Sequence, residues 1–182
     1  MKFLSTTLPS VTIVEPRIFS DSRGEFFESF NAKGFTNFLG SDGKFVQDNQ
    51  STSHKGVLRG IHYQIKQAQG KLVRVLTGSI YDIAVDLRKS SPTFGKSFGI
   101  ELSAENNKML WIPQGFGHAF LALENNTKVA YKTTDYWAPE FERTIIWDDP
   151  DLKISWPALQ SPPILSDKDL RGEPLKKAEL YD

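Results

Sequence analysis

The sequence contains no cysteine and only three histidines among its 182 residues. A chain without cysteine cannot form disulfides, thiolate nucleophiles, zinc fingers or iron–sulfur clusters. It suits a reducing compartment, and we expect a cytoplasmic location. Histidine is the only side chain whose ordinary pKa lies near neutrality. Acid–base chemistry at neutral pH therefore has few candidate residues in this chain.

Excess charge and long apolar runs are also missing. Lysine and arginine together number 22, as do aspartate and glutamate, so the formal net charge is zero. Such a chain has no long-range field to attract nucleic acid or acidic membranes. No apolar run approaches the ~18 residues of a membrane-spanning helix, and the first ten residues lack the apolar core of a signal peptide. We expect neither a nucleic-acid nor a membrane partner.

Length and composition indicate one globular domain. Hydrophobic residues make up 39% of the chain and charged residues 24%, which is typical of a single packed core at this length. No repeat or low-complexity segment divides the chain. We therefore expect one domain over residues 1–182, with the polar residues 171–182 as a loosely held tail.

Short alternations of apolar and polar residues dominate between the glycines and prolines, the period-two pattern of half-buried strands. Residues 71–76 and 80–87 flank a glycine-containing turn and predict a hairpin. Further strands are predicted at 98–102, 109–113, 118–123, 128–134 and 144–147. Helical signals are confined to 31–39, one turn at 103–106 and a first turn capped by Ser166. The pattern predicts an all-β sandwich or antiparallel barrel with a few short helices.

His62 is the first candidate site residue. A histidine in a strand usually packs and makes one hydrogen bond, but polar side chains accumulate around this one. Gln47 and Asn49 are two residues apart and project from one face of an extended segment, where buried amides are costly unless they bind something polar. Arg59 precedes His62 by three, so strict alternation puts the two on opposite faces. A shared cavity requires an irregular strand, which we expect at Gly60.

The other candidates each have a structural alternative. His118 follows a turn rich in glycine and proline, and it either packs or bonds a ligand oxygen. A buried tyrosine usually packs and bonds its hydroxyl, but it can also donate a proton across a substrate from a base. The segment alone does not distinguish Tyr131 from Tyr136 in that role. Asp169, in a first helical turn, is explained by the helix dipole alone.

Glu28 is unusual because it lies between Phe26 and Phe30 on one face of a predicted strand at 26–30. It either protects an edge strand from aggregation or binds a cation or hydroxyl group.

A metal site is not expected. Residues 56–64 and 113–118 resemble the two signatures of the cupin family, but metal-binding cupins generally carry His-x-His in the first signature. Here Gln64 replaces the second histidine, and a site with three histidines would need the distant His54.

These segments together resemble the dTDP-4-dehydrorhamnose 3,5-epimerase family. The matching stretches follow in order over nearly the whole chain, which makes the resemblance specific. They are DSRG at 21–24, FE at 27–28, QDNQS at 47–51, GVLRGIHYQ at 56–64, KLVR at 71–74, DLR at 86–88, SPTFG at 91–95, WIP at 111–113, HAF at 118–120, YKTTDY at 131–136 and LSDKD at 165–169.

The resemblance implies a cupin-type jelly-roll barrel, no metal, no cofactor and a homodimer. It implies a dTDP-linked 4-keto-6-deoxyhexose as substrate and epimerisation at C3 and C5 of dTDP-4-dehydro-6-deoxy-D-glucose, giving dTDP-4-dehydro-L-rhamnose for L-rhamnose biosynthesis. Both carbons flank the C4 ketone, so their protons are acidic and the carbanion is delocalised as an enolate. Removing a proton from one face and returning one to the other inverts each centre.

The same resemblance assigns roles to individual residues. His62 would be the general base, with Asp169 stabilising its imidazolium form, and Tyr131 the general acid on the opposite sugar face. Lys71 would stabilise the enolate oxygen. Arg59 and His118 would bind the sugar nucleotide. The remaining positions that match substrate contacts of the family are Arg23, Glu28, Gln47, Asn49, Glu142 and Lys168.

One departure from the family leaves an alternative open. Many members carry a second aromatic hydroxyl after Tyr136, where this chain has Trp137. The stereocentres inverted can therefore be C3 and C5 together, or C3 or C5 alone in another deoxysugar pathway. Two other classes compete: a non-catalytic nucleotide-sugar sensor and a metal-dependent cupin oxygenase.

Overall fold

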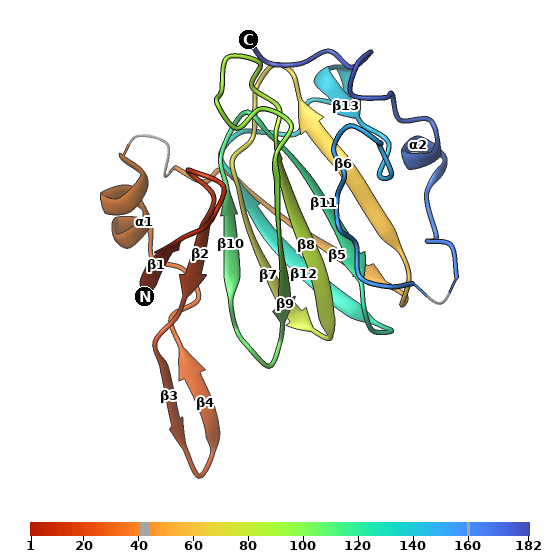
Figure 1. Cartoon of the computed structure of the whole chain (residues 1–182). Coiled ribbons are helices and arrows are strands. Elements are labelled where there is room, and N and C mark those ends of the chain that lie inside the picture. Colours follow the sequence, from red (N-terminus) through yellow and green to blue (C-terminus); the bar gives the residue numbers. More distant parts are fainter. Residues whose placement is uncertain (41–43, 160) are drawn as a thin grey trace.

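Two large antiparallel sheets form the body of the computed structural model, which describes residues 1–40, 44–159 and 161–182 (Figure 1). The six-stranded sheet has the order β1 (Lys2–Ser5), β2 (Thr12–Glu15), β10 (Met109–Ile112), β7 (Lys71–Thr77), β12 (Thr127–Thr133), β5 (Gln47–Ser53). The five-stranded sheet has the order β13 (Glu142–Thr144), β6 (Leu58–Gln64), β11 (Phe116–Ala122), β8 (Ser79–Asp86), β9 (Ser97–Ser103). The predicted all-β jelly-roll architecture is confirmed.

The two sheets pack face to face because alternating strand residues supply apolar side chains to the space between them. Val73 and Val129 of the six-stranded sheet lie in one buried cluster with Ile80 and Phe120 of the five-stranded sheet. This core fills one end of the space between the sheets and leaves the other end to polar side chains.

Helices are short and peripheral, as predicted. Among the described residues they are α1 (Ala32–Leu39), η2 (Pro139–Phe141) and α2 (Asp167–Leu170). Asn31 caps α1 by accepting a hydrogen bond from the Gly34 amide at 3.0 Å, and the helix buries Phe35 among aromatic side chains. Within the described residues no helix is long and apolar enough to cross a membrane.

Two predicted strands have different bounds in the structure. The strand expected at 144–147 is β13, which begins at Glu142 and ends at Thr144. Beyond it, Ile145 exchanges hydrogen bonds with Ile61, and Ile146 donates to Glu173 O of the C-terminal segment. The strand expected at 26–30 ends at Phe27, because Asn31 starts the cap of α1 shortly after it.

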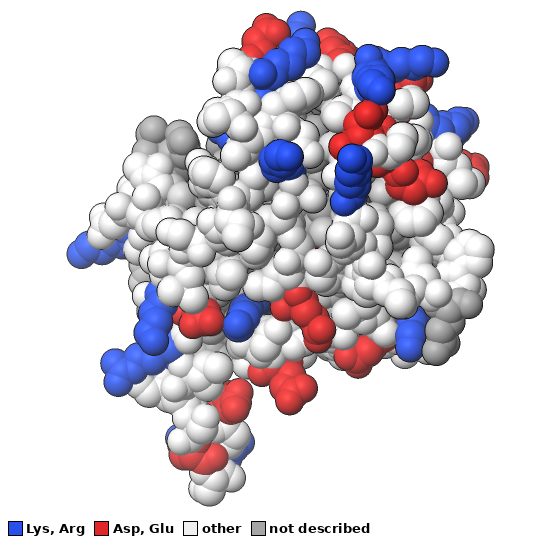
Figure 2. Space-filling model, viewed as in Figure 1, with Lys and Arg blue, Asp and Glu red and all other residues white. Residues whose placement is uncertain are grey.

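A hairpin of β3 (Ile18–Asp21) and β4 (Gly24–Phe27) projects from the body of the molecule (Figure 1). Phe19 is 50% exposed and Phe26 is 72% exposed. Lysine, arginine, aspartate and glutamate side chains are interspersed over the face in Figure 2, so neither sign forms a continuous field there. The hairpin therefore exposes two large apolar side chains beside the charged Asp21, Arg23 and Glu25.

The C-terminal residues, for which the sequence indicates a loosely held tail, run along the outer face of the five-stranded sheet. Leu175 is buried in a second apolar cluster. The Tyr181 hydroxyl donates to Gln64 O at 2.5 Å, and the Tyr63 hydroxyl donates to Glu179 O at 2.6 Å. Strand β6 therefore has contacts with this segment on the side away from the core between the sheets.

Gly60 interrupts β6 at the predicted place. The register between β6 and β11 shifts between His118 and Phe120, and Gly60 has φ +121° and precedes a cis peptide bond. A Cβ at this position would lie 2.5 Å from His118 O and from the Ala119 Cβ. The irregularity changes which face later residues point to, so Arg59 and His62 line the same cavity.

Replacing Gly60 by alanine is expected to lower the free energy of unfolding by about 3 kcal/mol or more. The added methyl group would clash with the backbone of the neighbouring strand, and the positive φ of this residue is unfavourable for alanine. Urea unfolding measures the loss.

Gly24→Ala is the matched control. Gly24 has φ +124° but nothing within 4 Å of an added Cβ, so this variant reports the backbone cost alone. Equal losses in the two variants would contradict the packing explanation.

Candidate active site

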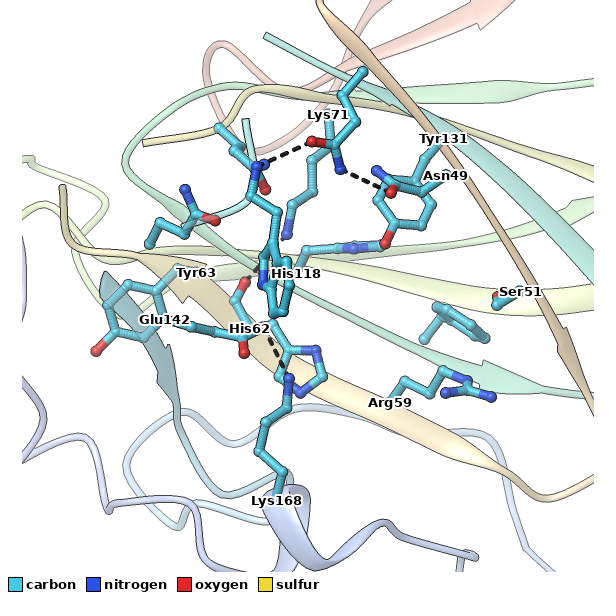
Figure 3. A pocket seen from close by; sticks show the side chains of 15 residues that line it. Asn49, Ser51, Arg59, His62, Tyr63, Lys71, His118, Tyr131, Glu142 and Lys168 are labelled. Atoms are coloured by element: carbon cyan, nitrogen blue, oxygen red, sulfur yellow. Dashed lines mark hydrogen bonds and ion pairs between the residues drawn. The ribbon is translucent and has the colours of Figure 1, made fainter. Parts of the chain in front are cut away.

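A cavity of about 390 Å³ lies between the two sheets at their polar end (Figure 3). Strands β5, β7 and β12 line it from one sheet, and β6, β11 and β13 from the other. Nine of the predicted site residues line it: Gln47, Asn49, Arg59, His62, Lys71, His118, Tyr131, Glu142 and Lys168.

Strand register explains why these side chains meet. His62 lies directly opposite His118 on the neighbouring strand, and Asn49 lies opposite Tyr131. Cross-strand partners project from the same face of a sheet. Thr133, two residues after Tyr131, is the partner of Lys71. Each sheet therefore presents one patch of polar side chains, and the two patches face each other across the cavity.

His62 is fixed by a buried carboxylate behind it. Its Nε2 lies 2.5 Å from Asp169 Oδ1, and Asp169 is 3% exposed. Asp169 Oδ2 accepts a hydrogen bond from the Ser166 hydroxyl at 2.6 Å, and Oδ1 accepts one from the Gly60 amide at 3.3 Å. The predicted cap at Ser166 is confirmed. Asp169 thus lies in a first helical turn and also pairs with His62, so the helix dipole is not its only partner.

At neutral pH the His62–Asp169 pair carries a single negative charge, which lies on Asp169. Burial raises the pKa of Asp169, but hydrogen bonds from His62 and Ser166 outweigh it and bring the pKa to about 2. Burial lowers the pKa of His62, and the bond to Asp169 only partly opposes it. The imidazole is therefore neutral at pH 7. With Nε2–H directed at an ionised carboxylate, its Nδ1 has the free lone pair.

Lys71 and Tyr131 come from the facing sheet and retain their protons. Burial lowers the pKa of Lys71 to about 8, although Glu142 and Asp82 oppose this, so the ammonium form prevails at pH 7. Burial raises the pKa of Tyr131, with a further increase from Glu142. The cavity therefore contains a neutral base on one sheet, and a cation and a protonated phenol on the other.

Polar groups at the cavity edge favour an anionic ligand. Arg59 donates to Ser53 Oγ at 3.1 Å and its side chain remains exposed. Lys168 donates to Glu142 Oε1 at 2.8 Å. Deeper in the cavity, His118 Nε2 lies 2.7 Å from the buried Asp82 Oδ1. Arginine and lysine at one rim are suited to a phosphate or diphosphate.

Three predicted site residues do not line the cavity. Asp169 lies behind His62, whereas Arg23 and Glu28 are away from it. Arg23 is in the turn of the projecting hairpin and pairs with Asp21 at 2.6 Å. Glu28 follows the hairpin and accepts a hydrogen bond from Asn31 Nδ2 at 2.9 Å. Both residues are exposed.

Several lining residues were not among the predicted site residues, including Ser51, Gln64, Gln69, Phe120 and Trp137. Alternation could have identified Ser51, which continues the face of Gln47 and Asn49. Gln64 could have been found in the same way from His62. No sequence signal marks Gln69, which lies in a connection between strands.

The position that metal-binding cupins fill with histidine has a different use here. Gln64 Nε2 donates to Gln67 O at 2.8 Å and to Tyr136 O at 3.2 Å, and its Oε1 accepts from the Ala138 amide at 2.9 Å. Among the residues that the structure describes, no three histidine, aspartate or glutamate side chains group as metal ligands would.

Comparison with known proteins identifies the family of this chain. Residues 5–177 match the family described as dTDP-4-dehydrorhamnose 3,5-epimerase. The relative of that name from Pseudomonas aeruginosa is 54% identical, over 100% of this chain and 99% of its own. The one from Shigella flexneri is 50% identical, also over 100% and 99%.

A solved structure gives the same result for the fold. The dTDP-6-deoxy-D-glucose-3,5-epimerase of Legionella pneumophila, in complex with dTDP-4-keto-L-rhamnose, superposes with a TM-score of 0.95. It is 47% identical and the match covers 99% of this chain and 97% of that one. The chain belongs to the dTDP-4-dehydrorhamnose 3,5-epimerase family, a cupin-type fold.

Proposed function

We propose that this protein epimerises dTDP-4-dehydro-6-deoxy-D-glucose at C3 and C5, producing dTDP-4-dehydro-L-rhamnose by cofactor-free proton transfer. The observation that carries the proposal is the pairing of a neutral, carboxylate-supported His62 on one sheet with a protonated Tyr131 on the other, lining one cavity. Membership of the epimerase family gives this geometry its substrate. The product serves L-rhamnose biosynthesis.

His62 acts as the base in this reaction. The protons on C3 and C5 are acidic because each carbon flanks the C4 ketone. The lone pair on His62 Nδ1 accepts the proton, and the developing imidazolium lies 2.5 Å from the ionised Asp169, which stabilises it without moving. Burial keeps the ring deprotonated until substrate arrives, so the base is available at neutral pH.

Lys71 stabilises the charge that forms on the C4 oxygen. A buried ammonium in a cavity of low dielectric interacts more strongly with an enolate than the same group in water does. Tyr131 then supplies a proton from the opposite side of the ring, because it comes from the facing sheet and because burial raises its pKa and so keeps the phenol protonated at neutral pH. Removal on one face and return on the other inverts the carbon. The imidazolium then releases its proton to solvent and the phenolate takes one up, which restores both groups for the second carbon.

Substrate contacts surround these groups. Arg59 and Lys168 at the rim hold the diphosphate, and His118 and Glu142 contact the sugar nucleotide. Gln47 and Asn49, linked by a hydrogen bond of 2.8 Å, present amide groups from β5.

We propose that Arg23 and Glu28 contact the substrate in the cavity of the other chain of a homodimer. Neither residue reaches the cavity of its own chain. Arg23 lies in the turn of the hairpin and Glu28 directly after it, and this hairpin projects from the molecule and exposes Phe19 and Phe26. An exposed pair of aromatic side chains on a projecting hairpin is typical of a surface that packs on a partner. In a homodimer, the hairpin of one chain can complete the cavity of the other.

We place the protein in the cytoplasm, with residues 1–182 acting as one domain.

His62→Asn and Tyr131→Phe are each expected to reduce turnover by about 10²- to 10⁴-fold or more, since each removes one proton-transfer group. Steady-state assays with the dTDP-linked 4-keto sugar measure the loss.

The chain offers a matched control for each variant. His54→Asn alters an exposed histidine outside the cavity, and Tyr81→Phe alters a half-buried phenol on β8 that does not line the cavity. Both controls should retain wild-type turnover. Wild-type turnover in His62→Asn and Tyr131→Phe as well would overturn the assignment.

Product formed in heavy water should contain deuterium at both C3 and C5, because the protons returned come from solvent-exchanged groups. NMR of the product locates the label. Label at one carbon only would replace the double inversion by a C3-only or C5-only epimerase. Tight binding without any label would instead indicate a nucleotide-sugar sensor.

The pH profile of kcat/KM should fall on both sides of neutrality. The acid limb reports protonation of His62, whose pKa is lowered, so its midpoint should lie below 6.5; below that pH the base is lost. The alkaline limb reports deprotonation of Lys71 near its pKa of about 8.

Two variants test these assignments separately. Asp169→Asn removes the group that raises the pKa of His62 and should move the acid limb to lower pH, with a lower maximum. Lys71→Arg should move only the alkaline limb upward. If both limbs stay where they are in both variants, these groups do not control the profile.

A further inference from the structure

Residues 134–138 connect β12 to η2 beside the cavity. The Trp137 side chain is 59% exposed and lines the cavity from this connection. Within the described part of the chain, the indole Nε1–H of Trp137 donates no hydrogen bond to another residue, whereas the backbone on either side of it is hydrogen-bonded. The position of the ring is therefore set largely by the backbone that carries it.

That backbone is held by glutamine side chains, of which Gln64 is buried. Gln64, 4% exposed, donates to Tyr136 O at 3.2 Å and accepts from the Ala138 amide at 2.9 Å. The NH2 group and the carbonyl oxygen of its side-chain amide therefore bind the backbone on either side of Trp137. A third bond, from Gln64 to Gln67 O at 2.8 Å, fixes the orientation of the amide itself.

Two more glutamines act on the same connection. Gln47 Oε1 accepts a hydrogen bond from the Trp137 amide at 3.0 Å, and Gln69 Nε2 donates to Asp135 O at 2.9 Å. Gln47 belongs to β5 of one sheet and Gln64 to β6 of the other. The connection is thus tied to both walls of the cavity.

We propose that Gln64 is a positioning residue which, together with Gln47, clamps residues 136–138 so that the Trp137 ring is held over the cavity mouth, where it contacts the bound nucleotide sugar. The proposal rests on the proposed function for the identity of the ligand. Gln64 stands where metal-binding cupins have a ligand histidine, and here it supports substrate binding by holding the loop that carries Trp137.

The expected loss of affinity follows from the fraction of molecules whose loop is in the conformation that binds substrate. A loop that occupies its binding-competent conformation for only a fraction of the time weakens affinity by that fraction. If loss of the clamp reduces that fraction to about one tenth, the Kd for dTDP rises about tenfold. The chemical step uses groups on the strands, so kcat should change by less than about twofold once substrate is saturating.

Gln64→Met tests this directly, because methionine keeps the length of the side chain and removes all three hydrogen bonds. We expect the Kd for dTDP and the KM for the keto sugar to rise about tenfold. Gln64→Leu, an apolar side chain of similar size, also removes all three hydrogen bonds without burying a charge. It should give a similar rise, and it provides a second variant if Gln64→Met does not fold.

A double-mutant cycle with Trp137→Ala separates positioning from a general loss of structure. If Gln64 acts through the indole, Gln64→Met should weaken dTDP binding in the wild type but add little in the Trp137→Ala background. Additive effects would overturn the proposal. Gln114→Leu is the matched control, since Gln114 donates to the Thr134 side chain (Oγ1) at 2.9 Å and forms no hydrogen bond with residues 136–138; its Kd should stay within twofold of wild type.

Hydrogen exchange of the peptide covering residues 134–141, in the ligand-free protein, gives a readout that needs no ligand. Protection should fall in Gln64→Met and remain in Gln114→Leu. Unchanged protection in Gln64→Met would reject the clamp even in a protein that does not bind dTDP. If wild type binds dTDP but exchanges no deuterium into the sugar, the proposed function fails while the clamp stands.

Discussion

The hydrogen bond between His62 and Asp169 is the interaction on which the rest of the site depends. It joins residues 107 positions apart, one on β6 and one in α2, and it buries a carboxylate that would be costly without partners. Ser166 and Gly60 supply those partners. Gly60 also bends β6 so that His62 enters the cavity. One glycine therefore both orients the base and donates a hydrogen bond to the carboxylate that supports it.

The division of groups between the two sheets gives the cavity its chemistry. His62 and His118 are on the five-stranded sheet, whereas Lys71 and Tyr131 are on the six-stranded sheet. Packed sheets lie about 10 Å apart, which leaves room for a sugar ring with one sheet on either side. Proton removal and proton return from opposite faces then require no movement of the backbone, only a ligand held between two rigid walls.

The sequence predicted those parts of the site that depend on local pattern. Alternation identified the shared face of Gln47 and Asn49, and a conflict in alternation located the irregularity at Gly60. Asp169 was different, because a first helical turn explains an aspartate locally and only the family resemblance pointed to His62 as its partner. Contacts between such distant segments depend on how the sheets pack, which no local pattern encodes.

The same limit explains what was missed or misplaced. Gln69 and Trp137 line the cavity from connections, whose paths follow from tertiary contacts rather than from periodicity. The strand expected at 144–147 begins earlier and ends at Thr144, since Ile145 and Ile146 are recruited by other segments. Arg23 and Glu28 matched family positions, but Arg23 lies in the turn of a projecting hairpin and Glu28 directly after it, and neither lines the cavity of its own chain.

The protonation state of His62 is the central claim, and nitrogen NMR of the labelled protein in its ligand-free state tests it most directly. The structure predicts a neutral ring at pH 7 with hydrogen on Nε2, a free lone pair on Nδ1 and a pKa below 6.5. A ring that is doubly protonated at pH 7, or that carries its hydrogen on Nδ1, would contradict the account.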